Sequence, residues 1–330
     1  MSNSATAAAA QKEISRRDRS HNSWGKALSQ HGWLYVMLVP GVVWMLIFCY
    51  LPMGGLVMAF ENFNPYAGGG GLINALLASE KVGFMNFQNL FMGTDFMMLL
   101  RNTLAISFAN LLIAFPAPII FALILNELRI MWFKRFSQTL VYIPHFVSLV
   151  IVYALTVQLF NSQDGFIIKM IESMAGRGSA PNVMGSPEFF VPLILGQNLW
   201  KETGYGTIIY LAALAGVDPQ LYEAAKIDGA NRWQLMWHVT LPAIKGTIVI
   251  MLIMKVGALL NTGYEQIFLL RNSMNASVAE VFDTYVYVKG VSNGQYSIAT
   301  TAGLFKSVVS LIMVLSANKV AKMLGESGLY

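Results

Sequence analysis

Charged side chains occur within segments whose other residues are mostly apolar, namely Lys201, Glu202, Lys255, Glu265 and Lys306. A charge at the centre of a membrane costs about 2.5–3.5 kcal/mol on insertion scales unless it faces a cavity or a partner. We therefore expect these groups to face the interior of a helical bundle, where they line a path for polar cargo or form ion pairs between helices. Lys306, which lies near the start of its helix, is expected to extend its ammonium group to the membrane surface.

The residues beside these charges mix glycine, hydroxyl, amide and aromatic groups: Trp200, Thr203, Gly204, Tyr205, Gly206, Asn261, Thr262, Gly263 and Tyr264. Aromatic rings can stack on pyranose rings, polar groups can replace water, and glycine lets the backbone loosen where it lines a cavity. The sequence therefore predicts a sugar path formed by Lys201, Glu202, Tyr205, Lys255, Asn261, Tyr264 and Glu265. The alternative is that the glycines serve close helix packing and the aromatic residues form an interfacial belt.

The sequence lacks the motifs that are characteristic of ATP binding, metal binding and disulfide formation. No G-x-x-x-x-G-K-[ST] segment is present to bind ATP, and the histidines (His21, His31, His145 and His238) do not have metal-ligand spacing. The single cysteine, Cys49, lies in an apolar run, so we predict neither a disulfide framework nor a cysteine metal site. We predict no catalytic residue, no metal site and no cofactor bound by this chain.

The elements that must position the polar residues are membrane-spanning helices. The chain of 330 residues is 55% hydrophobic and only 12% charged, whereas a soluble domain has about twice that charged fraction. Apolar runs long enough to cross a bilayer predict an all-α membrane protein with six transmembrane helices. The predicted spans are 34–60, 102–125, 139–160, 189–215, 247–270 and 298–320.

Basic residues in the connecting segments predict the orientation. Thirteen lysines and arginines fall in the N-terminal tail, in two loops and at the C-terminus on one side, against four in the loops of the other side. The net charge of +5 therefore indicates membrane topology rather than nucleic-acid binding, and the positive-inside rule places both termini in the cytoplasm. We expect residues 1–30 to be a flexible cytoplasmic tail and residues 31–330 to be the membrane domain.

A long polar segment, residues 218–242, separates the fourth and fifth predicted spans and is typical of a helix, a turn and a second helix. Asp218 before Pro219 supplies an N-cap, and Gly229 can end the first helix in a left-handed conformation. Asn231 can cap the second helix, which is expected to stop before Pro242.

This segment resembles the cytoplasmic EAA loop of permease subunits in binding-protein-dependent ABC importers. The resemblance rests on Glu223, Ala224, Ala225, Gly229, Leu241 and Pro242, with Val239 in place of the usual isoleucine. It implies that the loop docks into an ATPase subunit, with Glu223 forming an ion pair and Gly229 making the turn. The same family implies alternating access driven by ATP and magnesium held on two ATPase subunits, with a second, non-identical permease subunit and an extracytoplasmic solute-binding protein.

Further segments resemble the sugar-type permeases of this family, including Gly83–Phe87, Tyr142–Ser148 and Phe282–Tyr287. They imply an oligosaccharide or polysaccharide fragment as cargo, with an acidic, uronate-type sugar among the candidates, and a multi-pass protein of the bacterial inner membrane. Two alternatives stay open. The same machinery could carry another solute, or the membrane charges could form the relay of an ion-coupled secondary transporter.

Overall fold

The protein is described by a computed structural model that covers residues 24–326, 328 and 329. It divides into two compact units, Met1–Val57 and Met58–Tyr330, each of which is described by itself. Residues 1–23 of the predicted tail lie outside the described residues, and its last residues begin a helix. The described part of the first unit comprises α2 (Trp24–Met45), a π-helical turn η1 (Leu46–Tyr50), α3 (Leu51–Met53) and the start of the 3-10 helix η2 (Gly54–Phe60).

The second unit starts with a small folded region, which lies between the first two predicted spans. Strands β1 (Glu61–Asn62) and β2 (Glu80–Lys81) pair antiparallel, with Glu61 opposite Lys81. They enclose a 3-10 turn η3 (Ala67–Gly69) and α4 (Leu72–Ala78), and α5 (Met85–Met92) follows them. Four consecutive glycines, Gly68–Gly71, make a turn that needs positive φ angles, since Gly69, Gly70 and Gly71 have φ of 85, 92 and 86°.

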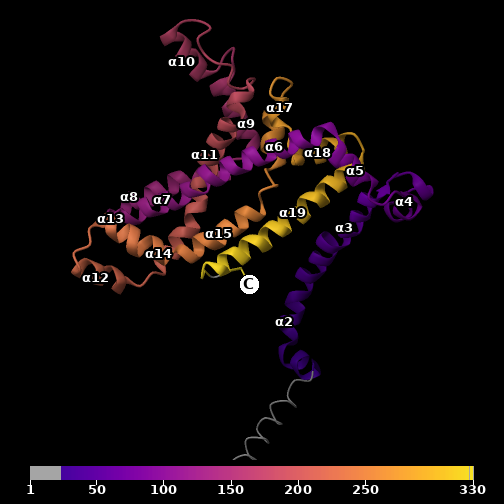
Figure 1. The fold of residues 1–330 in the computed structure, drawn as a ribbon. Coiled ribbons are helices and arrows are strands. Elements are labelled where there is room, and N and C mark those ends of the chain that lie inside the picture. Colours follow the sequence, from indigo (N-terminus) through magenta and orange to yellow (C-terminus); the bar gives the residue numbers. More distant parts are fainter. Residues whose placement is uncertain (1–23, 327, 330) are drawn as a thin grey trace, which may run out of the picture. The chain divides into compact units, whose positions relative to one another are not determined.

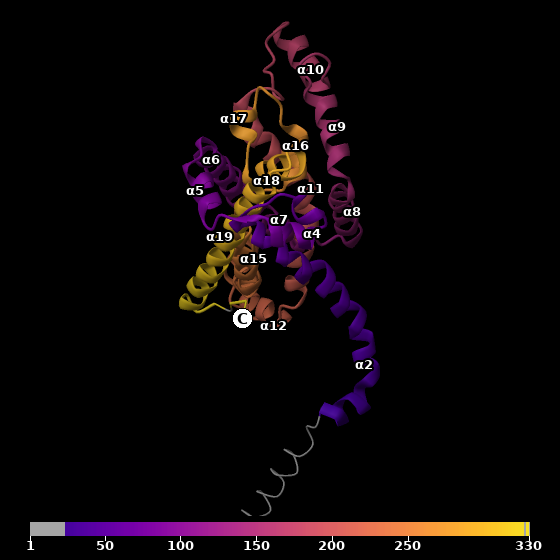
Figure 2. The same cartoon turned by 90° about the vertical axis from the view of Figure 1, so that its right-hand side faces the viewer.

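The remaining helices form the bundle of the second unit (Figures 1 and 2). In chain order they are α6 (Thr94–Ala109), η4 (Asn110–Ala114), α7 (Pro116–Glu127), α8 (Met131–Tyr142), η5 (Ile143–Phe146), α9 (Leu149–Phe160), α10 (Phe166–Ala175), α11 (Pro187–Ala215), α12 (Pro219–Ile227), α13 (Arg232–Leu235), η6 (Met236–Thr240), α14 (Leu241–Ala243), α15 (Lys245–Gly257), α16 (Tyr264–Leu270), α17 (Ala276–Ala279), α18 (Phe282–Val286), η7 (Tyr287–Ser292) and α19 (Tyr296–Met323). Helix α11 contacts α6, α7, α8, α15 and α17, and α15 packs along α19.

The described residues contain three helices that are long and apolar enough to cross a membrane: Gly32–Phe60, Thr94–Glu127 and Tyr296–Met323. Two bent pairs, Met131–Phe146 with Leu149–Phe160 and Arg232–Ala243 with Lys245–Gly257, bring the number to five if each pair is one span. Helix α11 matches the predicted span 189–215 in length, but its polar centre lowers its hydropathy. The structure is therefore that of a mostly helical membrane protein with three to five candidate spans, and six spans stay a prediction.

Two predicted spans are not continuous helices. Residues 139–160 bend by 99° because Pro144 interrupts the helix and Ser148 caps the next one, its Oγ accepting from Ile151 N at 3.4 Å. Residues 247–270 form α15 and α16, and the segment between them turns at Gly263, which has φ of 81°.

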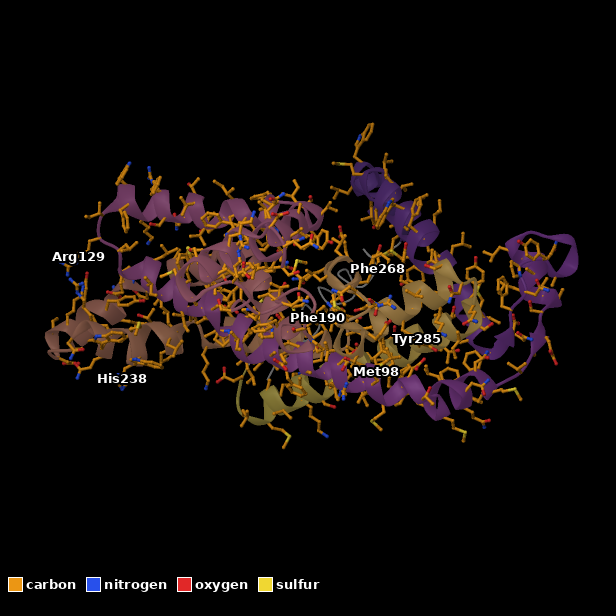
Figure 3. The ribbon with its side chains drawn as sticks, turned by 90° about the horizontal axis from the view of Figure 1, so that it is seen from above. Met98, Arg129, Phe190, His238, Phe268 and Tyr285 are labelled. Carbon is orange, nitrogen blue, oxygen red and sulfur yellow. The ribbon has the colours of Figure 1, made fainter. Side chains whose placement is uncertain are left out.

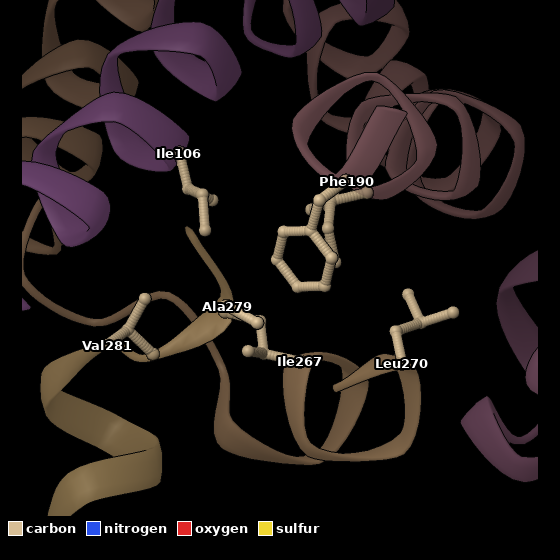
Figure 4. Packing of buried hydrophobic residues seen from close by; sticks show 7 residues of the cluster. Ile106, Phe190, Ile267, Leu270, Ala279 and Val281 are labelled. Carbon is tan, nitrogen blue, oxygen red and sulfur yellow. The ribbon is translucent and has the colours of Figure 1, made fainter. Parts of the chain in front are cut away.

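Buried apolar side chains gather in two clusters, both centred on α11. In the first (Figure 4), Phe190 and Ile194 of α11 meet Ile106 of α6 and Ile267 of α16. In the second, Tyr210 and Leu214 lie against Ile119 and Ala122 of α7 and against Ile244. Van der Waals packing between such surfaces, rather than their removal from water, holds helices together inside a bilayer.

The glycines near the centre of α11 serve close packing. A Cβ on Gly204 would collide with the backbone carbonyl of Val141 in α8, and one on Gly206 would lie 3.0 Å from Pro118 Cγ in α7. A Cβ on Gly196, in the same helix, would have no neighbouring atom within 4 Å. The packing alternative for the glycines is therefore supported at Gly204 and Gly206.

A Gly204→Ala variant is expected to lose about 1–3 kcal/mol of stability, because the new methyl group forces α8 away from α11. Gly196→Ala is the matched control, and it should be neutral or stabilising by up to about 1 kcal/mol through helix propensity. The measurement is the thermal midpoint of the purified membrane assembly. Equal midpoints for the two variants would contradict the packing role.

Candidate functional site

The polar segment between α11 and α15 folds as the predicted helical hairpin. Asp218 caps α12, its Oδ1 accepting from Gln220 N at 2.9 Å, and Pro219 occupies the first turn. Gly229 has φ of 82°, and beyond it Ala230 N donates to Ala225 O at 2.9 Å. A left-handed glycine followed by such a backward bond is a common helix C-terminus, so the first half follows directly from the sequence.

The second half begins as predicted but ends later. Asn231 Oδ1 accepts from Gln234 N at 3.0 Å and Gln234 Oε1 accepts from Asn231 N at 2.8 Å, which forms a capping box. The expectation that this helix stops before Pro242 is wrong, since the helix continues through α14. The π-helical turn η6 precedes Pro242, and its extra residue makes room for the proline ring. The chain bends by 61° only between α14 and α15.

The hairpin encloses a shallow hollow of about 320 Å³, lined by Ala225, Asp228, Gly229, Ala230, Gln234, His238 and Val239. Of the predicted coupling residues, only Ala225 and Gly229 line it. Glu223 and Ala224 are exposed, and no ion pair or hydrogen bond involves the Glu223 carboxylate among the described residues. Leu241 packs against the second apolar cluster, while Pro242 is exposed. The surface of the hairpin therefore carries an unpaired carboxylate and a shallow hollow.

The charges of α11 are engaged with the turn that follows α8. Lys201 Nζ donates to His145 O at 2.5 Å and lies 3.4 Å from Glu202 Oε1, while Glu202 Oε2 lies 2.9 Å from His145 Nδ1. The His145 ring stacks on Tyr205, with centroids 3.9 Å apart and planes 5° apart. Only 13% of the Lys201 side chain is exposed, against 50% for Glu202. Lys201 thus has a carbonyl and a carboxylate beside it within the chain.

His145 is a site residue that reasoning from charge and hydropathy misses. The sequence marks it only within the sugar-permease resemblance, because a single histidine beside a proline has no metal-ligand or catalytic spacing that would single it out. The signal that could identify it is its place in a Pro-His pair at the predicted opening of a span. Such a pair interrupts the helix and turns a polar ring toward its neighbours.

The break between α15 and α16 is held by Asp283, which the sequence marks only as part of the segment Phe282–Tyr287 that resembles sugar-type permeases. Its Oδ2 accepts from Thr262 N at 2.8 Å, from Thr262 Oγ1 at 3.1 Å and from Gly263 N at 3.2 Å. Its Oδ1 pairs with Lys306 Nζ from α19. Lys306 is 8% exposed, so the expectation that it reaches the membrane surface is wrong. The largely enclosed carboxylate of Asp283 already pairs with the ammonium group inside the bundle.

The other predicted path residues lie on either side of this break, and all of them are exposed: Lys255, Asn261, Tyr264 and Glu265. Tyr264 stacks on Tyr287 with ring centroids 4.6 Å apart. Among the described residues, neither Lys255 nor Glu265 has an ion-pair or hydrogen-bond partner for its side chain. Lys255 is therefore available to a ligand in a way that Lys201 is not.

The two groups of path residues are not joined by any direct polar contact in the described part of the chain. The helices that carry them are linked instead by buried amides. Gln266 Nε2 donates to Gln197 Oε1 at 2.9 Å, and Gln197 Nε2 donates to Thr156 Oγ1 at 2.7 Å, which connects α16, α11 and α9. Figure 3 shows the side chains of these helices in one view, with His238 of the hairpin far from Phe190 and Phe268. In the described part of the chain, no hydrogen bond or ion pair joins the predicted coupling residues to the path residues.

Comparison with protein families finds one that spans these regions. The family described as "Binding-protein-dependent transport system inner membrane component" matches residues 114–325. This range includes every predicted coupling and path residue.

Individual proteins match over almost the whole chain. Protein LplB of Bacillus subtilis (strain 168) is 49% identical over 93% of this chain and 94% of its own length. The polygalacturonan/rhamnogalacturonan transport system permease protein YteP of the same organism is 49% identical over 92% of both. A chain in the crystal structure of a bacterial alginate ABC transporter in complex with an alginate pentasaccharide-bound periplasmic protein is 37% identical, with a TM-score of 0.83 over 93% of this chain and 99% of that one.

Proposed function

Because the chain belongs to the family of binding-protein-dependent transport system inner membrane components, we propose that it is the permease subunit of an ATP-driven importer for an acidic oligosaccharide. The observation that carries this proposal is the agreement between two independent likenesses. A relative at 49% identity is a polygalacturonan/rhamnogalacturonan permease, and the similar structures belong to an importer of the acidic polysaccharide alginate. Polygalacturonan and alginate both carry carboxylates, which favours an acidic cargo.

The hairpin supports coupling to an ATPase. Its exposed Glu223 can pair with a cation of a partner, and its hollow, with Ala225 and Gly229 in the wall, can receive an apolar side chain. In this proposal two ATPase subunits hold ATP and magnesium, and this chain binds no cofactor. A second, non-identical permease completes the pore, and an extracytoplasmic binding protein delivers the cargo, as the periplasmic protein of the alginate complex suggests.

The orientation follows from the same premise. An ATPase docks from the cytoplasm, so the hairpin and both termini lie on the cytoplasmic side of the inner membrane. Six spans satisfy this arrangement if α11 crosses as one of them beside the five candidates. Its Lys201 and Glu202 then lie within the bilayer, where their mutual proximity and the bonds to His145 lower the cost of two charges.

The two path lysines differ in exposure and in their partners. Lys255 is exposed beside the α15–α16 break and has no acceptor within the described chain, so it can offer its ammonium group to a uronate carboxylate. Lys201 is mostly buried against His145 and Glu202, so it serves to hold η5 on α11. Tyr264 and Asn261 lie beside the same break and supply the stacking and hydrogen-bonding groups that a sugar needs.

A Lys255→Gln variant is expected to lose uptake of an acidic oligosaccharide selectively. A charge-assisted hydrogen bond contributes about 1.5–3 kcal/mol, so half-saturation should rise by about 10–100-fold. Uptake of a neutral oligosaccharide of equal length should change little. The measurement is the uptake of both sugars by proteoliposomes that contain the complete transporter.

Lys201→Gln is the matched control, because it removes the same charge from the neighbouring helix. It is expected to lower assembly and the uptake of both sugars together. Equal losses for the two sugars in Lys255→Gln, with assembly intact, would show that Lys255 does not meet the acidic group and would remove it from the path.

A further inference from the structure

Helix α8 carries an exposed stripe that the transport proposal does not use. Its members recur at helical spacing on one face: Met131, Trp132, Arg135, Phe136, Thr139 and Leu140, with exposures of 59% for Met131, 72% for Trp132 and 52% for Phe136. Helix α8 also contacts α11, whereas the residues of the stripe stay exposed. The stripe is thus an unpartnered surface of the bundle within the described chain.

The kind of side chain in the stripe changes along the helix. A guanidinium and two aromatic rings occupy its first half, and an aliphatic side chain, Leu140, follows in its second half. Trp132 and Phe136 stack with centroids 5.7 Å apart and planes 8° apart. Aromatic rings and arginine at one end of an apolar helix face are typical of the membrane–water boundary. Helix α8 begins at the end of the second unit where the hairpin lies, as the positions of Arg129 and His238 in Figure 3 show.

A shallow hollow of about 440 Å³ lies on this stripe and is lined by Met131, Trp132, Arg135, Phe136 and Thr139. One cation and one hydroxyl share its wall with three apolar side chains. In the described residues no carboxylate forms an ion pair with Arg135, or with Lys134 and Arg129 nearby. The hollow therefore suits a ligand that is anionic at one end and apolar at the other.

We propose that this face of α8 is a binding site for an anionic phospholipid of the cytoplasmic leaflet. The phosphate accepts from the Arg135 guanidinium, and the start of an acyl chain lies along the stacked rings of Trp132 and Phe136. Planar guanidinium groups bind phosphate through two parallel hydrogen bonds, which a lysine cannot supply. The placement in the cytoplasmic leaflet depends on the proposed orientation, whereas the charge and shape of the site do not.

The test measures contact with lipid rather than transport, so it can succeed or fail independently of the proposed function. The complete transporter is placed in nanodiscs that contain brominated phosphatidylglycerol or brominated phosphatidylcholine in an unbrominated background. Bromine quenches tryptophan emission on contact, and subtracting the signal of a Trp132→Phe variant isolates Trp132. Quenching of Trp132 should reach half its maximum at a fraction of brominated phosphatidylglycerol about fivefold lower than the fraction of brominated phosphatidylcholine that is needed. A basic residue near an anionic surface contributes about 1 kcal/mol of binding free energy, which corresponds to this ratio.

Arg135→Gln should abolish this preference and leave quenching by the two lipids equal. Lys134→Gln removes the same charge from the adjacent position, which does not line the hollow, and it should keep the preference. Equal quenching by both lipids in the wild type would mean that the face contacts acyl chains without a headgroup site. Absence of Trp132 quenching by either lipid would mean that a protein partner or water covers the face. Each of these two results would overturn the proposal.

Discussion

A Glu223→Lys protein is expected to fold and insert into the membrane normally and to lose cargo-stimulated ATP hydrolysis. Glu223 is exposed on α12 and has no partner among the described residues, so the substitution should change folding stability by no more than about 0.5 kcal/mol. At the proposed contact with the ATPase subunit, however, the substitution replaces an ion pair by a contact between two like charges. Losing a close charge pair at an interface costs about 2–5 kcal/mol, or at least about thirtyfold in affinity for the ATPase.

The measurement is ATP hydrolysis by the purified complex with and without loaded binding protein. Glu127→Lys is the matched control, since Glu127 is another carboxylate at the surface, at the end of α7, and its reversal should leave stimulation intact. Wild-type stimulation in Glu223→Lys would remove the ion-pair role from this residue. Equal losses in both variants would show that bulk charge, and not docking, is responsible.

Replacing Asp283 by asparagine is expected to have the second large effect. The carboxylate accepts from both residues that precede α16 and pairs with Lys306, so the variant leaves a buried ammonium group without its counter-charge. Breaking one partner of a buried pair costs about 3–5 kcal/mol. The thermal midpoint should fall, and uptake should fall with it, because the break no longer holds Asn261 and Tyr264 in place.

A double variant separates stability from positioning. Asp283→Asn with Lys306→Met removes both charges and should recover most of the thermal midpoint, since an apolar replacement of a buried pair is often neutral. Uptake should stay low, because a neutral amide oxygen accepts from Thr262 and Gly263 more weakly than the charged carboxylate does. Full recovery of uptake in the double variant would show that Asp283 only balances Lys306.

Local sequence signals predict the hairpin well. Asp218, Gly229 and Asn231 act through bonds to residues two to five positions away, and such bonds do not depend on the rest of the fold. The expectation fails at Pro242, because proline ends a helix only where the preceding turn cannot widen. Here the π-helical turn η6 accommodates it.

Long-range pairing could not be predicted from the chain alone. The sequence places Lys306 near the start of a predicted span, and only the fold brings it to Asp283, 23 positions earlier. His145 and Glu202 are 57 positions apart, and nothing in either segment indicates their contact. Segment length likewise could not reveal the breaks at Pro144 and Gly263, because the predicted spans that contain them, 139–160 and 247–270, are each long enough to cross a bilayer as one helix. The path candidates lie on or beside the helices where the sequence places them, but their partners came from the structure.

The central claim, that this chain moves an acidic oligosaccharide at the expense of ATP, is tested most directly by uptake into proteoliposomes containing the complete transporter. A labelled acidic oligosaccharide is added outside with its binding protein, and ATP or a non-hydrolysable analogue is enclosed within. Uptake should require both enclosed ATP and the binding protein, and it should persist when ion gradients are collapsed. Uptake that proceeds without ATP and stops when a proton or sodium gradient is removed would contradict the account and indicate an ion-coupled carrier.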